Sequence, residues 1–418
     1  MMLTRFFRRI QLNSADFVPA NKNYMPLNAD ERAAIERVRA AADGVGHPYC
    51  DHDYNIHRWI TAYGGDEEEA ARVLKRHLNI REIMSITELP NSNSGEIDEE
   101  AEKYAPLTIL GRNRMDDNKV LLFEHSGRID LNGVVDNIRI TRFLRMKFRT
   151  MERLQQRVEQ EERRLDKQSG GVLIMDLEGL SFSTNLLSVL AGPYRILWGT
   201  LFEQYPQLIQ QIIIVNAPKF VNLLYQTCIP FIPQDYKSKI IICSGIPKET
   251  LLKHIDECCL PVELGGGGSC EMTSSGEFEI YSPIQPPLAP YPKAAPLQIP
   301  LEQLTIPAGA FTTQQYKWNA GSRLEFYMQH DQEFTLFFFH ANDDTKDTTT
   351  WREIYAGCER PALPQIDTWQ WTVPHDGYYY IRYGNEKAWL FSVTVRHLIY
   401  QLKESEKTIV MPISTFVH

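Results

Sequence analysis

The sequence predicts three structural units in order: a helical bundle, an α/β domain built on a mostly parallel sheet, and an all-β sandwich. The prediction rests on the hydrophobic period, which changes twice along the chain. The period is that of amphipathic helices over residues 28–90. It alternates between strand and helix over 105–265 and becomes two after residue 300. The 418 residues are enough for two or three domains.

The helical bundle is expected over residues 28–104, after a tail of residues 1–27. Asn28 offers an N-cap for a first helix, a second helix is predicted over His57–Tyr63, and Asp66 caps a third. In the third helix the inward-facing residues recur every three or four positions, as they do on one helix face. These residues are Ala70, Val73, Leu74, His77 and Leu78.

The α/β domain is expected over residues 105–266. Most of its predicted strands are continuous apolar runs, which is typical of parallel strands covered on both faces. A long charged helix over Val135–Asp166, ending at Gly170-Gly171, and a second helix over Leu186–Tyr205 separate them, so right-handed βαβ units are expected. The predicted strands are Val120–Phe123, Gly171–Leu177, Ile212–Val215 and Lys239–Cys243.

A Gly/Pro-rich linker over residues 267–299 precedes the predicted sandwich of residues 300–402, and residues 403–418 are expected to be a tail. Within the sandwich, apolar residues alternate with polar ones in short runs separated by turns, which is typical of antiparallel strands with one buried face. The alternating apolar residues are Leu324, Phe326, Met328, Phe334, Leu336, Phe338, Trp369, Trp371, Val373, Phe391, Val393 and Val395.

The bulk composition excludes several classes of protein. A formal net charge of −9 argues against a nucleic-acid partner. No apolar run approaches the roughly 20 residues that span a bilayer. The arginine-rich start, with Arg5, Arg8 and Arg9, favours a membrane-touching or frayed tail over a mitochondrial presequence. Seven cysteines, without a secretory signal, are expected to be reduced thiols in the cytoplasm.

The usual signatures of catalysis are missing from the α/β domain, and no enzymatic activity is predicted. There is no G-x-S-x-G elbow, and Asn216-Ala217-Pro218 places no nucleophile after its strand. Gly265–Gly268 lacks the Lys-Ser/Thr and helix of a phosphate-binding loop. Asp176 and Glu178, with Glu124 and Asp130 elsewhere, lack a histidine or serine to complete a mechanism, so structural hydrogen bonding is favoured.

Two further polar groupings have a structural and a functional interpretation. The first is rich in potential metal ligands but has no second cluster at matching spacing, which favours turns and helix caps over a metal site. It comprises His47, Cys50, Asp51, His52, Asp53 and His57. The second lies on the long helix and is either a surface for anionic lipid or, as we favour, a solvated face. It comprises Arg139, Arg142, Arg145, Lys147 and Arg149.

The nearly uncharged segment Leu223–Pro233 is either a core helix or a movable lid over an apolar cavity. With its neighbours it resembles the CRAL-TRIO lipid-transfer family, whose best-known members exchange phosphatidylinositol and phosphatidylcholine. The resemblance covers roughly residues 30–266 and rests on the joint order of several segments. They are Arg58-Trp59-Ile60, Val120–Asp130, Ile174–Ser181, Tyr205-Pro206, Ile213–Pro218, Ser238-Lys239-Ile240 and Leu260–Gly266.

Residues 300–400 resemble a GOLD domain, a β-sandwich found in Golgi-trafficking proteins and in the animal branch of this lipid-binding family. The resemblance rests on Val373–Tyr380 followed by Tyr383-Gly384-Asn385. It implies a sandwich that recruits the protein to membranes or to a protein partner.

The CRAL-TRIO resemblance implies one bound hydrophobic lipid, a phospholipid such as phosphatidylcholine or an isoprenoid-type lipid, beneath a gating helix over Phe220–Ile232. No other cofactor and no metal are expected. Lys239 matches a headgroup lysine of the family, whereas Gln207 replaces a glutamate and Tyr63-Gly64 replaces an Arg-Lys pair, so phosphoinositide is not expected. The candidate lipid-binding residues are Ser181, Ser183, Thr184, Tyr194, Phe220, Leu224, Tyr225, Phe231 and Lys239.

Two interpretations of these residues remain open. Ser181, Ser183 and Thr184 either hydrogen-bond a headgroup or cap a turn. The whole protein is expected to be a cytoplasmic lipid-transfer protein that associates peripherally with the Golgi or other endomembranes. The alternative is a trafficking adaptor or lipid sensor at the Golgi that acts through the sandwich.

Overall fold

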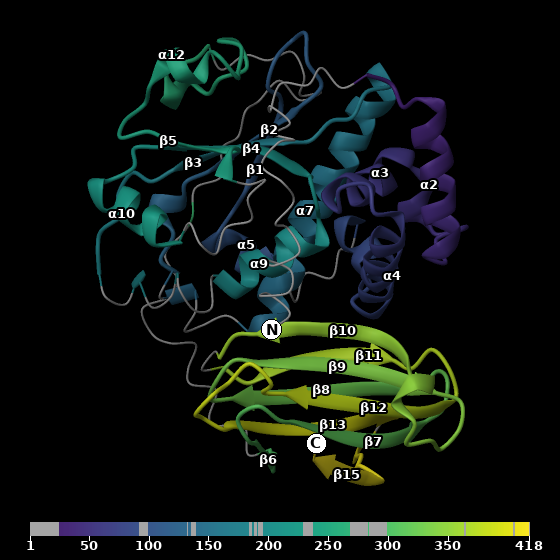
Figure 1. Ribbon diagram of the computed structural model, residues 1–418. Helices are drawn as coiled ribbons and strands as arrows, with labels where there is room; N and C mark the ends of the chain where they lie inside the picture. The colour runs from purple at the N-terminus through teal and green to yellow at the C-terminus, as the bar shows by residue number, and fades with distance from the viewer. Residues whose placement is uncertain are drawn as a thin grey trace.

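The computed structural model has the three units that the sequence predicts: helical bundle, α/β domain and β-sandwich (Figure 1). It describes residues 25–91, 99–131, 133–134, 139–183, 186–187, 190, 195–228, 237–267, 283, 299–362, 365–403 and 406–417. The predicted fold class is therefore confirmed. Among the helices within these ranges, none is both long and apolar enough to cross a membrane.

The helical bundle confirms both predicted caps. Asn28 accepts a hydrogen bond from the Glu31 amide at 2.9 Å while the Glu31 carboxylate accepts one from the Asn28 amide, and Asp66 accepts one from Glu69. The second helix begins at Asp53, four residues before the predicted start. The elements are α2 (Ala29–Ala41), η1 (Pro48–Asp51), α3 (Asp53–Ala62), α4 (Glu67–Ile83), η2 (Ile86–Asn91) and α5 (Glu99–Tyr104).

The α/β domain has a five-stranded sheet in the order β1-β2-β3-β4-β5. The four predicted strands are present and parallel, with Leu122, Leu173, Ile212 and Ile240 aligned across them. An antiparallel edge strand, β1, was not predicted, because its five residues include a glycine and carry no clear alternation. The strands are β1 (Thr108–Arg112), β2 (Val120–Glu124), β3 (Gly171–Asp176), β4 (Ile209–Val215) and β5 (Ile240–Ile242).

The long helix α7 (Ile140–Leu165) lies near the centre of the molecule (Figure 1), and the prediction about its basic side chains is wrong. It ends at Leu165, within one residue of the predicted Asp166, and the left-handed conformation of Asp166, which aspartate tolerates, ends it before Gly170-Gly171 is reached. Its basic side chains are not a solvated face: Lys147 is buried against Glu124 at 3.3 Å, and Arg149 is also buried. The other helical segments are η3 (Ser126–Arg128), α9 (Arg195–Gln204), α10 (Lys219–Cys228), α12 (Lys248–Leu251) and η6 (Val262–Leu264).

The sandwich consists of two antiparallel sheets, β10-β9-β12-β7-β15 and β11-β8-β13-β14, with β6 paired to β13. Its strands are β6 (Glu302–Ile306), β7 (Phe311–Trp318), β8 (Arg323–His330), β9 (Phe334–Ala341), β10 (Arg352–Arg360), β11 (Asp367–Thr372), β12 (Gly377–Gly384), β13 (Val393–Lys403), β14 (Glu406–Ile409) and β15 (Ser414–Val417), with the short helix η7 (Thr348–Thr350). Aromatic side chains from both sheets, among them Phe326, Phe338 and Trp371, fill the space between them.

Two details of the sandwich differ from the sequence prediction. Strands β14 and β15 lie within the tail predicted for residues 403–418, and they extend both sheets. Phe391 was predicted to continue the buried alternation of Val393 and Val395. Strand β13 begins only at Val393, however, and the Phe391 side chain is 72% exposed in the preceding loop.

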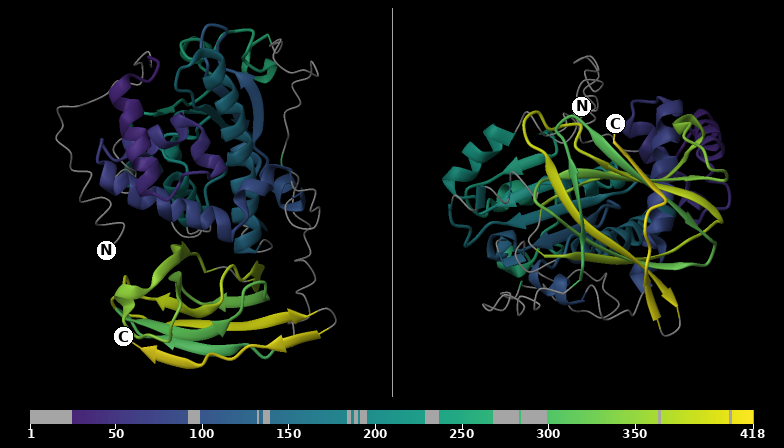
Figure 2. Two further views of the ribbon diagram at one scale, coloured as in Figure 1. Left: turned by 90° about the vertical axis from the view of Figure 1, so that its right-hand side faces the viewer. Right: turned by 90° about the horizontal axis from the view of Figure 1, so that it is seen from below.

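The sandwich docks on the other two units through polar contacts. Figure 2 shows it lying below the bundle and the α/β domain. Asp367 of the sandwich accepts hydrogen bonds from the amide and hydroxyl of Thr141, at 3.1 and 2.7 Å, at the start of α7. Arg76 of α4 lies 3.3 Å from the Glu353 carboxylate, and Asn79 donates to the Glu353 carbonyl at 3.0 Å. The first turn of α7 and one face of α4 therefore position the sandwich.

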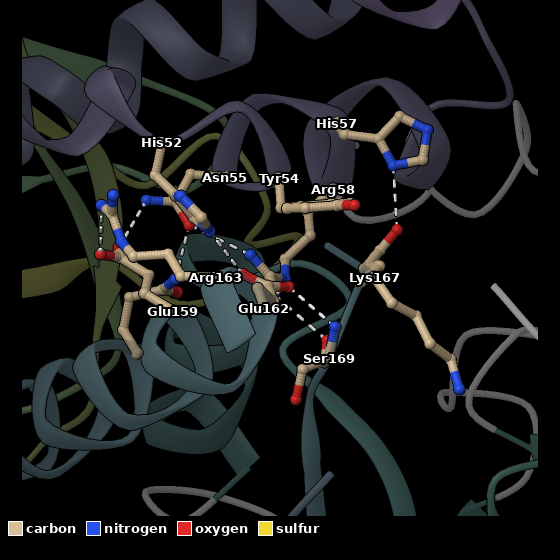
Figure 3. A network of polar contacts seen from close by, with 12 residues as sticks. His52, Tyr54, Asn55, His57, Arg58, Glu159, Glu162, Arg163, Lys167 and Ser169 are labelled. Atoms are coloured by element: carbon tan, nitrogen blue, oxygen red, sulfur yellow. Dashed lines mark hydrogen bonds and ion pairs between the residues drawn. The ribbon is translucent and has the colours of Figure 1, made fainter. Parts of the chain in front are cut away.

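A buried charge network joins the bundle to the end of α7 (Figure 3). Arg58 of α3 and Glu162 of α7 are 1% and 0% exposed at the side chain and form an ion pair. Glu162 also contacts His52 at 2.8 Å and accepts a hydrogen bond from the Ser169 amide at 2.8 Å. Arg58 donates to Asn55 and to the Ser169 carbonyl. The charges are thus paired and hydrogen-bonded, as buried charges must be.

A second buried network lies at the junction of α4, α7 and the residues after α9. Arg81 donates two hydrogen bonds to Glu152, at 2.6 and 2.7 Å, and the Tyr205 hydroxyl donates to the same carboxylate at 2.8 Å. Beside it, His77 contacts Gln204 at 2.9 Å and packs against the Tyr205 ring. Burial, with a smaller effect from the Arg81 charge, holds the pKa of His77 well below its usual value.

Replacing Glu162 by alanine is expected to lower the free energy of unfolding by about 3–5 kcal/mol, because the substitution leaves the Arg58 charge buried without its carboxylate. Urea unfolding measures the loss. The matched control, Glu68→Ala on the exposed face of α4, should change the free energy of unfolding by no more than about 0.5 kcal/mol. Equal effects of the two substitutions would contradict the structural importance of the buried pair.

His77 is expected to make the protein less stable in mild acid. Below about pH 6.5 the unfolded chain binds a proton at this histidine. The folded protein does not, so the free energy of unfolding falls by up to about 1.4 kcal/mol per pH unit. Urea unfolding between about pH 7 and pH 5 should show a shallower decline for His77→Gln than for the unmodified protein. Replacing the exposed His375 by Gln serves as the control, and a decline unchanged by His77→Gln would disprove the assignment.

Candidate functional site

The two faces of the α/β sheet are covered to different extents. On one face, side chains from three strands, including Leu121, Ile174 and Ile213, are completely buried. They pack against the segment that contains α12, through Leu251, Ile255 and Leu260. Over β2, β3 and β4 this face is an ordinary sealed core, whereas Ile241 of the edge strand β5 is half-buried on it.

The opposite face becomes less covered towards β4 and β5. Val120, Leu122 and Leu173 are buried there beside α7, but Met175, Ile214 and Ile240 on the same face are only half-buried. Phe202 of α9 and Phe220 of α10 border the same region and are also half-buried. Large apolar side chains that remain partly uncovered inside a domain are suited to contact a hydrophobic molecule. We regard this half-buried face as the candidate site.

Helix α10 (Lys219–Cys228) is the described part of the predicted gating helix. Its first turns pack on the domain through Val221, which lies in a small cluster with Leu177 and Ala217. The Phe220 ring contacts the Phe182 ring edge to face at a centroid distance of 5.4 Å, and Phe182 is 57% exposed. Phe182 was not predicted as a site residue, although its position between Ser181 and Ser183 after a buried strand was a usable signal.

The remaining predicted residues of the gating helix are only partly described. Tyr225 is half-buried, whereas Phe231 and the Leu224 side chain lie outside the described residues. Thr184 and Tyr194 lie outside them as well.

Two predicted serines follow β3, near α10. Ser181 is exposed. The Ser183 hydroxyl accepts a hydrogen bond from the Leu186 amide at 2.9 Å, which is the turn-capping role considered for it. A hydroxyl that accepts a hydrogen bond still has its own proton to donate, so capping leaves Ser183 able to bind a second group.

Lys239 lies at the opposite end of the strands, where β4 and β5 begin. It precedes β5 and donates to the Gln207 side chain, which precedes β4, at 2.7 Å. The C-terminal ends of the strands instead carry Ser181 and Ser183, after β3, and Phe220, after β4. Because β4 has seven residues, its two ends are about 20 Å apart. The structure therefore brings Lys239 and Gln207 together, but it separates them from the serines.

The carboxylates at the strand ends make structural contacts. Asp176 accepts hydrogen bonds from the Asn216 side chain and the Glu178 amide, both at 2.9 Å. Glu124 accepts one from Ser126 at 2.6 Å and pairs with Lys147. These are the structural roles that the sequence favoured.

The residues of the possible metal cluster are dispersed among separate contacts. His47 accepts a hydrogen bond from the Tyr49 amide at 3.1 Å and caps η1, His52 contacts Glu162, and Asp53 pairs with Arg39. Over the parts of the chain that the structure describes, no three potential ligands of this kind gather at one point. Cys50, Cys243, Cys258 and Cys259 are free thiols, and burial raises the pKa of Cys50 to about 11.

A pocket of about 290 Å³ lies between α4 and the sandwich, away from the candidate site. None of the predicted lipid-binding residues line it. Its walls include Asn79, Ser85, Arg323, Arg352, Trp371 and His375.

Comparison with known proteins gives matches for both halves of the chain. The family model for the CRAL/TRIO domain matches residues 103–266, and the model described as F28H7_8_C-like, C-terminal domain matches residues 287–410. The second range contains most of the sandwich strands.

Two curated proteins of Caenorhabditis elegans are similar over long stretches. CRAL-TRIO domain-containing protein F28H7.8 is 28% identical over 381 residues, which cover 90% of this chain and 91% of that protein. CRAL-TRIO domain-containing protein C34C12.6 is 24% identical over 260 residues, covering 58% and 63%. A solved structure described as "Crystal structure of Sfh5" aligns with a TM-score of 0.44 and 15% identity, over 65% of this chain and 99% of that one. The chain is thus similar to the CRAL/TRIO domain over residues 103–266 and to the F28H7_8_C-like C-terminal domain over residues 287–410.

Proposed function

We propose that this protein holds one hydrophobic lipid against the half-buried face of its α/β sheet, beneath α10, and exchanges it with membranes. The observation that carries the proposal is the contrast between the two faces of one sheet. Over β2 to β4 one face is sealed by protein, while the other leaves Met175, Ile214 and Phe220 partly uncovered, in a region similar to the CRAL/TRIO domain. Acyl chains would complete that cover, gaining about 0.8 kcal/mol for each buried methylene group.

Helix α10 suits the role of a gate for physical reasons. Pro218 precedes its first residue, and Asn216 adopts a left-handed conformation, so the chain turns sharply where the helix begins. Of the α10 side chains that the structure describes, none makes a hydrogen bond or ion pair with the rest of the domain. Apolar contacts such as Phe220 on Phe182 hold it instead, and such contacts are exchanged for lipid contacts at little cost when the helix opens on a bilayer.

We place the headgroup at the C-terminal ends of β3 and β4, beside Ser181 and Ser183. Both hydroxyls can donate hydrogen bonds to a phosphate oxygen, and a zwitterionic phosphocholine needs no further cationic partner. Lys239 lies too far away to contact the same headgroup. Its partner Gln207 and the Tyr63-Gly64 pair depart from the phosphoinositide-binding pattern. We therefore propose a phosphatidylcholine-type or isoprenoid-type cargo, and no phosphoinositide.

The sandwich is proposed to bring the protein, from the cytoplasm, to the Golgi or other endomembranes, in keeping with its resemblance to a GOLD domain. A specific observation also favours the alternative role of lipid sensor or trafficking adaptor. Asp367 of the sandwich is hydrogen-bonded to the first turn of α7, the helix that covers the sheet beside the candidate site, so a change in that helix would reach the sandwich. A protein partner that distinguishes loaded from empty protein would support this alternative.

Mass spectrometry of lipid extracted from the protein, purified from its own cells, is the first test. One lipid class bound near one per chain would support the cargo site and name the cargo. Protein that is folded and reproducibly free of lipid would overturn the proposal and favour the adaptor.

Replacing Phe220 by aspartate is expected to reduce lipid transfer between vesicles to near the protein-free rate. The substitution places a charge on the apolar side of α10, where neither the sheet nor an acyl chain can solvate it. Transfer of a fluorescent phosphatidylcholine from donor to acceptor vesicles measures the effect.

The matched control is Asn222→Asp, which adds the same charge at an exposed position of the same helix. It should transfer lipid normally, and circular dichroism should show that both variants are folded. If Phe220→Asp is unstable, Phe182→Asp tests the same contact from its exposed side. Normal transfer by the folded variants would exclude α10 as the gate.

A further inference from the structure

The loop between β12 and β13 presents three consecutive large apolar side chains to solvent. Trp389, Leu390 and Phe391 are 94%, 82% and 72% exposed. Single exposed apolar residues are common on protein surfaces, and the others in the described residues are separated along the sequence. Three adjacent side chains at a loop tip are a different feature, which we call the WLF tip.

The loop that carries the WLF tip is held in a defined conformation. Asn385, buried at its base, donates from its side chain to the carbonyls of Ile306, Pro307 and Phe391 at 3.0–3.2 Å. The Asn385 amide also donates to Ala310, and its carbonyl accepts from Gly309 and Ala388. Lys387 pairs with Glu359 of β10 at 3.1 Å. The exposure of the tip is therefore fixed by the fold, and little conformational entropy is lost when the tip is buried in a partner.

The size and chemistry of the WLF tip favour a bilayer over a protein. Three such side chains cover roughly 500 Å², whereas a stable protein complex buries about 800 Å² on each partner. Tryptophan concentrates where hydrocarbon meets the headgroups, because its ring is apolar and its indole N–H is a donor. Leucine and phenylalanine beside it supply the part that enters the hydrocarbon.

The charges around the WLF tip indicate which bilayer it fits. Glu386 lies in the loop, Asp331 accepts from the Thr394 amide just after it, and Glu359 lies beside Lys387. Glu359 pairs with Lys387, so Glu386 and Asp331 add negative charge near the WLF tip, in a chain whose formal net charge is −9. An anionic surface would repel this end of the sandwich, whereas a zwitterionic surface would not.

We propose that the WLF tip is a membrane-docking site that inserts into the headgroup region of a neutral, phosphatidylcholine-rich bilayer. The inference extends the proposed exchange of lipid with membranes, but docking needs no cargo on the sheet. Each side chain that inserts strengthens partitioning by about tenfold or more.

Flotation with phosphatidylcholine vesicles tests the proposal on the full chain. The triple variant Trp389→Ser, Leu390→Ser, Phe391→Ser should bind at least about tenfold more weakly than the unmodified protein. The control carries the same number of serine substitutions at exposed apolar positions of the same domain, Ile409→Ser, Met411→Ser, Ile413→Ser, and should bind normally. Adding phosphatidylserine should not strengthen binding.

Quenching by brominated phosphatidylcholine locates the contact. Tryptophan fluorescence of the unmodified protein should be quenched on vesicles, and Trp389→Phe should remove that quenching while binding persists. Unchanged vesicle binding by the triple variant, quenching that survives Trp389→Phe, or binding only to anionic vesicles would each overturn the proposal. The triple variant should keep any extracted lipid, and Phe220→Asp should keep vesicle binding, so failure of docking is distinguishable from failure of the cargo site.

Discussion

The need to pair charges buried along α7 determines how the bundle and the α/β domain fit together. Glu162 near the end of the helix pairs with Arg58, Glu152 in the middle pairs with Arg81, and Lys147 pairs with Glu124 of the sheet. Each group would be costly to bury alone, so each fixes the position of its partner. Two of these ion pairs connect α7 to helices of the bundle, and the third connects it to a strand of the sheet. The helix therefore sets the position of both units at the same time.

The position of α7 determines where the candidate site lies. Because α7 covers the half of its sheet face that lies over β2 and β3, the other half, at β4 and β5, depends on α9 and α10 for cover. Those helices contribute Phe202 and Phe220 but leave Met175 and Ile214 half-buried. Edge strand β5 is half-buried on both faces, but in β4 the incomplete cover is limited to this face, because Ile213 and Val215 on the opposite face are completely buried. We propose that an exchangeable ligand occupies this incompletely covered region.

The sequence was a good guide where a signal was local. The apolar runs predicted β2 to β5, and the Asn28 and Asp66 caps predicted two helix starts, because each depends on a few neighbouring residues. The partners of the basic residues on α7 could not be predicted, since a charge on a helix does not reveal whether a distant carboxylate faces it. Phe391 was misplaced because alternation continues through a loop as readily as through a strand.

For the candidate site, too, some features could be predicted from the sequence and others could not. Ser181 follows its strand and Lys239 precedes its own, and in a parallel sheet this order already places them at opposite edges. The separation could therefore have been predicted from the order of elements, whereas the resemblance to a family suggested a single set of residues. The half-burial of Met175 and Ile214 could not have been predicted, because it depends on how far helices from other parts of the chain extend over the sheet.

A protein that exchanges lipid must meet two opposing demands: it has to shield apolar cargo from water, and it has to present apolar surface to a bilayer. A single surface that did both would be exposed whenever the cargo left. We propose that in this chain the two demands fall on different domains, with the shielded surface on the sheet and the exposed one on the sandwich. The exposed part is only three side chains on a rigid loop, small enough to keep the protein in solution. Contacts such as Asp367 with Thr141 then hold the two surfaces in a fixed relation, so that docking of one orients the other.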